Sequence, residues 1–162
     1  MANQTLKLSQ QLGRQLQERH WRVATAESCT GGGVAAAITA SAGSSAWFEY
    51  GIVSYANTAK QKLLGVCETS LTEEGAVSAA VVTEMVNGVL TLSSADIAVA
   101  ISGIAGPGGG TPEKPVGTVW FAWATATGDL LTEQKQFDGD RHDVQSQSVI
   151  HALQGLIDLS KP

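Results

Sequence analysis

The sequence of 162 residues has few cysteines and no dense block of charge. Its two cysteines, Cys29 and Cys67, are too few for a disulfide framework, so a reducing, cytoplasmic location is expected. A net charge of −5 without any Lys/Arg block argues against a protein that binds nucleic acid in a basic groove. No apolar run is long enough to cross a bilayer, and the polar segment 1–11 has no signal-peptide core. We therefore expect neither a nucleic-acid partner nor a membrane partner.

Patterns typical of bound metals and nucleoside triphosphates are also missing. No cluster of Cys and His has the spacing of a zinc site, and the scattered carboxylates form no convincing metal site. The glycine-rich segment 102–110 lacks the Gly-Lys-Ser/Thr ending of a P-loop, which argues against nucleoside triphosphate chemistry. We expect neither a metal nor an organic cofactor.

What the sequence does contain is a regular alternation of helical and strand patterns. Apolar residues at helical spacing predict helices over 3–19, 57–64 and 74–92, with further helical segments after the glycines at 31–33 and around 149–157. Short apolar runs predict strands over 21–26, 47–55, 96–102, 117–125 and 130–137. We expect a single three-layer α/β/α domain over residues 1–162, and the close-set run 117–137 predicts a hairpin, hence a mixed, mostly parallel sheet. Trp47 and Phe48 are expected at the surface, where they would allow a homodimer.

The first glycine-rich segment predicts a junction between a strand and a helix with a reactive group at the turn. An apolar run from Val23 to Ala26 leads into Ser28, Cys29 and three glycines. Backbone amides at such a turn point at the group that the hydroxyl attacks or binds. Successive side chains of a strand point to opposite faces, so only one of Ser28 and Cys29 is expected to enter the site. The residues alone do not decide which one does.

A serine nucleophile needs a base, and Lys60 is the better candidate. With Asn57 as the helix cap, Lys60 falls at the third helical position, where the positive helix end and burial would lower its pKa. Tyr55, at the end of the preceding strand, could share in the proton transfer or orient the substrate. Two alternatives stay open: Lys60 and Tyr55 are ordinary structural residues, or His142 is the base.

Two further segments have the chemistry of a ligand site. The loop at 102–110 follows a buried strand, and loops at the carboxyl ends of strands are where α/β sheets bind ligands. Its alternative interpretation is a tight turn made rigid by Pro107 and Pro112. Arg141 begins the last helix and suits a phosphate or carboxylate, although a surface ion pair would also explain it.

A series of segments, taken in order, resembles the CinA C-terminal domain family, the nicotinamide-nucleotide amidases. They are Ala26-Glu27-Ser28-Cys29-Thr30-Gly31-Gly32, Ser54-Tyr55-x-Asn57-x-x-Lys60, Gly75-Ala76-Val77-Ser78, Ser102-Gly103-Ile104-Ala105-Gly106-Pro107-Gly108-Gly109, Lys114-Pro115-Val116-Gly117-Thr118-Val119 and Gly139-Asp140-Arg141. The resemblance spans residues 5 to 158, nearly the whole sequence. Longer members carry an N-terminal domain that resembles molybdopterin-binding proteins, and its pyrophosphatase activity is not expected here.

The resemblance implies hydrolysis of the carboxamide of nicotinamide mononucleotide to nicotinate mononucleotide and ammonia. It implies Ser28 as nucleophile, Lys60 as base and Tyr55 as an assisting group. The residues expected to hold the substrate are Gly103, Gly106, Pro107, Gly108 and Arg141, and those expected to offer amides to the oxyanion are Thr30, Gly31 and Gly32. Gln145 stands where many members have a second Arg. A silent nucleotide-binding module and an interaction protein linked to DNA uptake or repair remain as alternatives.

Overall fold

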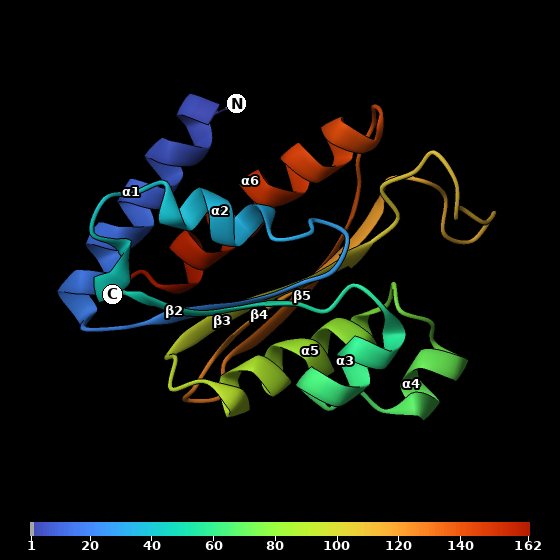
Figure 1. Ribbon diagram of the computed structural model, residues 1–162, viewed down its shortest axis with the longest axis horizontal. Helices are drawn as coiled ribbons and strands as arrows, with labels where there is room; N and C mark the ends of the chain where they lie inside the picture. Colours follow the sequence, from blue (N-terminus) through green and yellow to red (C-terminus); the bar gives the residue numbers. More distant parts are fainter. Residues whose placement is uncertain (1) are drawn as a thin grey trace.

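The computed structural model describes residues 2–162 as a five-stranded sheet with helices on both faces (Figure 1). The strands are β1 (Val23–Glu27), β2 (Phe48–Val53), β3 (Ile97–Gly103), β4 (Thr118–Thr125) and β5 (Leu130–Gln136). The helices are α1 (Ala2–Arg19), α2 (Gly33–Thr39), α3 (Asn57–Leu64), α4 (Glu68–Glu73), α5 (Ala79–Leu92) and α6 (Arg141–Leu159), with a 3₁₀ turn η1 (Ser44–Ala46). The predicted α/β class is confirmed.

The strand order β2-β1-β3-β4-β5 makes the sheet mixed. β1 is parallel to both β2 and β3, whereas β4 is antiparallel to both β3 and β5. Four of the five strands therefore point in one direction, and the predicted hairpin is β4–β5. Because Glu27 pairs with Val53 on one side and Ile101 on the other, the chain leaves β1 between the carboxyl ends of two neighbours.

Two apolar cores fill the space between the sheet and its helices. Helices α1, α2 and α6 cover one face, and α3, α4 and α5 cover the other (Figure 1). In β1, Val23 belongs to the first core, whereas Ala24 and Ala26 belong to the second. This alternation continues past the end of the strand, so Ser28 lies on the α3 side and Cys29 packs into the core below α6.

The helix predicted over 74–92 is wrong at its start. A separate short helix, α4, ends at Glu73, and Gly75 then takes a left-handed conformation with a φ of 80°. Ser78 caps the next helix by accepting a hydrogen bond from the backbone of Val81, so α5 begins only at Ala79. The apolar spacing continued across this interruption, because the irregular segment 75–78 is itself packed against the protein.

The expected surface position of Trp47 and Phe48 is also wrong. Trp47 is only 2% exposed, and Phe48 packs partly buried against the same core. The Trp47 indole occupies a slot over Gly13 of α1, where a Cβ atom would lie 2.8 Å from the ring. The spacing of residues around Trp47 does not reveal this slot, because the slot exists only where Gly13 of α1 has no side chain. The predicted homodimer therefore has no basis in these two side chains, because they do not form an exposed apolar surface.

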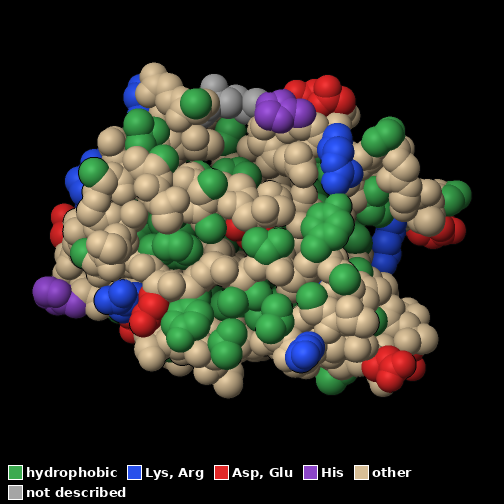
Figure 2. Space-filling model, in the orientation of Figure 1, with side chains coloured by type: hydrophobic (Ala, Val, Ile, Leu, Met, Phe, Trp, Pro, Cys, Tyr) green, Lys and Arg blue, Asp and Glu red, His purple; other side chains and the backbone are tan. Residues whose placement is uncertain are grey.

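The surface seen in Figure 2 has no concentrated basic patch. On the face shown in Figure 2, Lys and Arg side chains are scattered instead of being gathered into one patch. Within residues 2–162, no helix combines the length and the apolar character needed to cross a membrane.

Candidate active site

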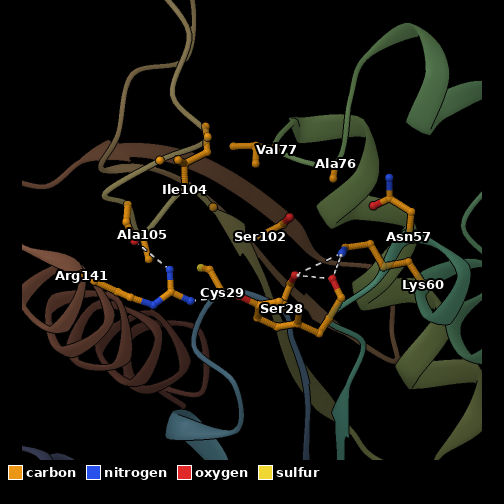
Figure 3. Close-up of a pocket in the computed structure, with 15 residues that line it drawn as sticks. Ser28, Cys29, Asn57, Lys60, Ala76, Val77, Ser102, Ile104, Ala105 and Arg141 are labelled. Carbon is orange, nitrogen blue, oxygen red and sulfur yellow. Dashed lines mark hydrogen bonds between the residues drawn. The ribbon is translucent and has the colours of Figure 1, made fainter.

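A cavity of ≈ 280 Å³ lies at the carboxyl ends of β1 and β3 (Figure 3). It is lined by the turn after β1, the start of α3 with the residues before it, the irregular segment before α5, the loop after β3 and the first residue of α6. Segments that are far apart in the sequence meet here because parallel strands end at the same edge of the sheet. The predicted nucleophiles, base and arginine all contribute to this lining.

Ser28 and Lys60 are in direct contact in the cavity. The Lys60 Nζ atom lies 3.1 Å from Ser28 Oγ and 3.0 Å from the backbone oxygen of Tyr55. The Ser28 amide donates to the carbonyl of Ile101 over 3.0 Å, which fixes the backbone of the serine to β3. The two parts of a nucleophile and base pair are therefore within hydrogen-bond reach, 32 residues apart in the sequence.

The start of α3 differs from the prediction by one residue. Asn57 is not the cap: Ala56, in an extended conformation, precedes the helix, and its carbonyl accepts from the amide of Lys60 over 3.1 Å. Asn57 is the first helical residue and lines the cavity. Lys60 consequently sits one position deeper in the helix than expected, with its long side chain reaching back toward β1 (Figure 3).

Burial lowers the pKa of the Lys60 ammonium below its ordinary value. The side chain is 1% exposed, and interaction with the Cys29 sulfur opposes the shift only in part. Among the described residues that line the cavity there is no Asp or Glu to stabilise the charged form by an ion pair. A larger share of neutral amine follows, which is the form that accepts a proton.

Tyr55 contributes its backbone and its side chain to different parts of the site. Its carbonyl accepts from Lys60 and, over 3.4 Å, from the Ser28 hydroxyl. Its phenol is 58% exposed and accepts a hydrogen bond from Arg141 over 2.9 Å. The phenol therefore faces the arginine and not the amine, and its part in proton transfer remains a prediction.

Arg141 closes the cavity on the side opposite Lys60 (Figure 3). Its Nη1 donates to the carbonyl of Gly106 over 2.8 Å, while its Nη2 binds Tyr55. A capping box between Asp140 and Asp143 begins α6 and fixes the place from which the guanidinium extends. This one side chain thus joins α6 to the loop after β3 and to the end of β2.

A second cavity of ≈ 500 Å³ adjoins the first and shares Arg141 with it. His142, the alternative base, lines this second cavity and has no place in the lining around Ser28. Of the glycine-loop residues predicted to hold the substrate, Gly103, Gly106 and Gly108 line the first cavity and Pro107 lines the second.

The structure does not bring Thr30, Gly31 and Gly32 into the cavity. The Thr30 hydroxyl donates to the Glu27 carboxylate over 2.6 Å, and the Gly31 amide donates to the carbonyl of Ser28 over 3.0 Å. These hydrogen bonds lie within the turn that follows the serine and hold that turn in place. The prediction that their backbone amides stabilise an oxyanion is not supported by this arrangement, because none of the three residues lines the cavity.

Comparison with known proteins identifies the family and the fold of this chain. The chain matches the family described as the CinA C-terminal domain over residues 5–160. It belongs to that family. It is 55% identical over 154 residues to the nicotinamide-nucleotide amidohydrolase PncC of Escherichia coli (strain K12), covering 95% of this chain and 93% of that protein. A PncC of the same name from Pseudomonas putida is 53% identical over 94% of both chains. The crystal structure of the competence/damage inducible protein CihA from Agrobacterium tumefaciens matches with a TM-score of 0.95 at 42% identity, covering 98% of this chain and 96% of that one.

In this CinA C-terminal domain, Ser102 and Gln145 make contributions at or near the cavity that the sequence did not predict. Ser102, at the end of β3, is 2% exposed and lines the cavity, and its hydroxyl has no hydrogen-bond partner among residues 2–162. Gln145 donates from its side chain to the carbonyl of Cys29 over 3.0 Å, which ties α6 to the turn after the serine. Ser102 begins a glycine-rich segment that the sequence analysis noted, but only the fold shows that it lines the same cavity as Ser28.

Both Ser28 and Cys29 line the cavity, which differs from the expectation that only one would. Cys29 lies between Arg141 and Ser28 in the view of Figure 3. Burial and, to a lesser extent, the charge of Glu27 raise the pKa of the Cys29 thiol to about 12. The cysteine therefore stays protonated near neutral pH, whereas the serine has an amine beside it.

Proposed function

We propose that this chain hydrolyses the carboxamide of nicotinamide mononucleotide, giving nicotinate mononucleotide and ammonia. The observation that carries the proposal is the contact of 3.1 Å between Ser28 and a buried Lys60 at the carboxyl ends of the parallel strands β1 and β3. The similar proteins from Escherichia coli and Pseudomonas putida are named nicotinamide-nucleotide amidohydrolases, and this chain covers nearly their full length.

In the first step, Ser28 Oγ attacks the carboxamide carbon while the neutral amine of Lys60 accepts its proton. The carbonyl of Tyr55 holds the amine in place, because one Lys60 N–H donates to it. For the transfer, the neutral amine turns its lone pair to Ser28 Oγ, which lies 3.1 Å from Nζ, and the serine hydroxyl turns from the Tyr55 carbonyl to the amine. This step converts the carboxamide into a tetrahedral intermediate with a negatively charged oxygen.

The side-chain donor best supported for that oxygen is Ser102. Its hydroxyl is buried at the cavity wall and has no acceptor among the described residues, so it is free to donate to the substrate. One well-placed donor to an oxyanion is worth about 3 kcal/mol of the activation barrier. The amides of Thr30, Gly31 and Gly32 would serve this purpose only after the turn rearranges.

Collapse of the intermediate breaks the carbon–nitrogen bond, and the Lys60 ammonium gives its proton to the departing nitrogen, which leaves as ammonia. Water then attacks the acyl-serine ester, with Lys60 accepting a proton from the water and returning one to Ser28. The sum of both steps is one carboxamide and one water giving one carboxylic acid and one ammonia.

The nucleotide part of the substrate is assigned to the Arg141 side of the cavity. A guanidinium pairs well with a phosphate because its donors match two phosphate oxygens. Gly108 has no side chain and open space beside it, which leaves room for the substrate along the same wall. The adjoining cavity of ≈ 500 Å³ gives the ribose phosphate space beyond the reacting carboxamide.

An ammonia-release assay with nicotinamide mononucleotide tests the proposal. The wild type should release ammonia, Ser28→Ala should lose the rate by orders of magnitude at an unchanged melting temperature, and Cys29→Ala should keep most of it. Binding of the mononucleotide in a calorimeter without any ammonia would make the chain a silent binding module. If instead Cys29→Ala is inactive at an unchanged melting temperature while Ser28→Ala keeps its rate, the nucleophile is the cysteine.

A further inference from the structure

Glu27 is a buried carboxylate directly before the proposed nucleophile. It is 1% exposed and accepts hydrogen bonds from the Thr30 hydroxyl over 2.6 Å, the Val34 amide over 2.8 Å and the Ala35 amide over 3.0 Å. Two of these donors are first-turn amides of α2, which otherwise lack acceptors inside the helix. The carboxylate of the chain itself thus occupies the positive end of this short helix.

These bonds fix the turn that carries both candidate nucleophiles. Glu27 joins the end of β1 to the start of α2, while the Ser28 amide donates to the Ile101 carbonyl and the Ser28 carbonyl accepts from Gly31, each over 3.0 Å. Ser28 is left facing Lys60, whereas Cys29 also lines the cavity but packs against the core on the α6 side. A shift in this turn would change which of the two groups meets the amine.

We infer that Glu27 is a positioning residue that selects Ser28 over Cys29 as the nucleophile. It does so by holding the turn so that the Ser28 hydroxyl lies against Lys60, and by placing a negative charge beside the Cys29 sulfur. The inference rests on the proposed serine mechanism and assigns a residue to it that touches neither substrate nor reacting atoms.

The charge arrangement explains why such a selection is needed. Three charged groups act on the Cys29 sulfur: Glu27 from β1, Lys60 from α3 and Arg141 from α6. Arg141, and Lys60 in its charged form, favour a thiolate, which is a stronger nucleophile than a serine hydroxyl. Burial and Glu27 work in the opposite direction and keep the thiol protonated. Without Glu27, the pKa of the Cys29 thiol would fall, although burial, the larger cause of its rise, would remain.

The test uses two reagents that need no turnover of the mononucleotide. A fluorophosphonate labels an activated serine, with Ser28→Ala as the blank, and iodoacetamide at pH 8.5 alkylates a thiolate, with mass spectrometry to separate the cysteines. In Glu27→Gln, labelling of Ser28 should slow by about a hundredfold because the nucleophile is misplaced. Alkylation of Cys29 should rise about tenfold for each unit by which its pKa falls.

Glu84→Gln is the matched control, because Glu84 also accepts a backbone amide and also lies beside a cysteine. It accepts from the amide of Cys67 over 3.1 Å on the far side of α5, and its hydrogen bond raises the pKa of the Cys67 thiol. This variant should speed alkylation of Cys67 and leave labelling of Ser28 unchanged.

Thr30→Val separates the positioning effect of Glu27 on the turn from the effect of its charge on Cys29. It also provides the test if Glu27→Gln fails to fold. It removes the bond of 2.6 Å but keeps the carboxylate, so Ser28 labelling should fall by about tenfold while Cys29 stays unreactive. Unchanged Ser28 labelling in both variants, at retained melting temperature, overturns the inference. Failure of the proposed function is a separate result, namely a wild type that is labelled at Ser28 but releases no ammonia.

Discussion

Lys60 combines a 1% exposed side chain with a pKa that burial lowers, and this sets the pH dependence of the proposed reaction. Only the neutral amine accepts the Ser28 proton, so kcat/KM for nicotinamide mononucleotide should rise with pH along an acidic limb. The midpoint of that limb should lie below the ordinary pKa of lysine. A pH–rate profile measures it, and Lys60→Arg should be nearly inactive at neutral pH because a guanidinium stays charged. Substantial turnover by Lys60→Arg would return attention to His142.

The same lowered pKa has a consequence for stability. The unfolded chain binds the Lys60 proton more tightly than the folded chain, so the contribution of this residue to stability rises with pH. Lys60→Met should therefore be folded but inactive, with a melting temperature at neutral pH no lower than that of the wild type. The difference between the two melting temperatures should narrow as the pH is raised, which thermal unfolding over a pH series measures.

Arg141 is expected to act on binding of the phosphate. Arg141→Ala should raise KM for the mononucleotide by about ten- to a hundredfold, since a charge-assisted contact is worth about 1.5–3 kcal/mol. The unphosphorylated riboside should be a poor substrate for both enzymes and nearly indifferent to the change. Tyr55→Phe removes only the phenol that binds Nη2, so its effect on KM should be smaller. Equal losses on both substrates would instead assign Arg141 to the chemistry or to the fold.

Residues were predictable where their chemistry is unusual for their place in the sequence. A hydroxyl at a glycine-rich turn, a lysine at a helix start and an arginine at another helix start attract notice without coordinates. Glu27 and Ser102 do not, because a carboxylate beside a strand and a serine at a strand end are common. Their significance comes from burial and from their partners, and these depend on β1 and β3 lying side by side.

At the scale of elements, the site depends on the close approach of α3 and α5. Gly88 of α5 lies against the backbone of α3, where a Cβ atom would be 2.0 Å from the carbonyl oxygen of Leu64. Alanine is normally the better helix residue by about 1 kcal/mol, but here Gly88→Ala must push α3 away. Because α3 carries Lys60, we expect a lower melting temperature together with a lower kcat.

The neighbouring residue supplies the control for that change. Asn87 is exposed on the same helix, and Asn87→Ala should leave both the melting temperature and kcat near their wild-type values. A Gly88→Ala variant that is as stable and as active as Asn87→Ala would contradict the prediction for Gly88→Ala, because it would show that the added methyl group is accommodated without displacing Lys60.

The bounds of helices and strands were predicted correctly wherever the apolar periodicity and the residues that end a helix or strand indicated the same boundary. The strands fell close to their predicted ranges, and Gly65 ended α3 as expected. The prediction was wrong at 74–92, where Val77 continued the apolar stripe although Gly75 and Ser78 had already ended one helix and begun another. The local apolar pattern reports burial, and a buried irregular segment produces it as well as a helix does.

For the molecule as a whole, the proposed chemistry should not depend on metal. Serine and lysine chemistry needs no Lewis acid, and within residues 2–162 no three His, Cys, Asp or Glu side chains gather as ligands. Prolonged dialysis against EDTA should leave the rate of ammonia release equal to that of a sample dialysed without it. Loss of the rate and its recovery with zinc, magnesium or manganese would contradict the mechanism.

The α/β architecture was the most predictable property, because strands alternating with helices allow few arrangements. The placement of Trp47 was not predictable, since it depends on the space above Gly13 in another helix. The cavity was only partly predictable from the sequence. Its edge of the sheet follows from topology, but its walls depend on contacts such as Arg141 with Gly106, which join segments 35 residues apart.

The protonated state of Cys29 also bears on survival under oxidative stress. Peroxide oxidises thiolates to sulfenic acid and then further, and hydrolases with a cysteine nucleophile lose activity by this route. Here the Cys29 sulfur is 5% exposed and holds its proton, and in the proposed mechanism the attacking atom is the oxygen of Ser28. A catalyst built in this way would continue to release ammonia at peroxide concentrations that silence a thiol-dependent amidase.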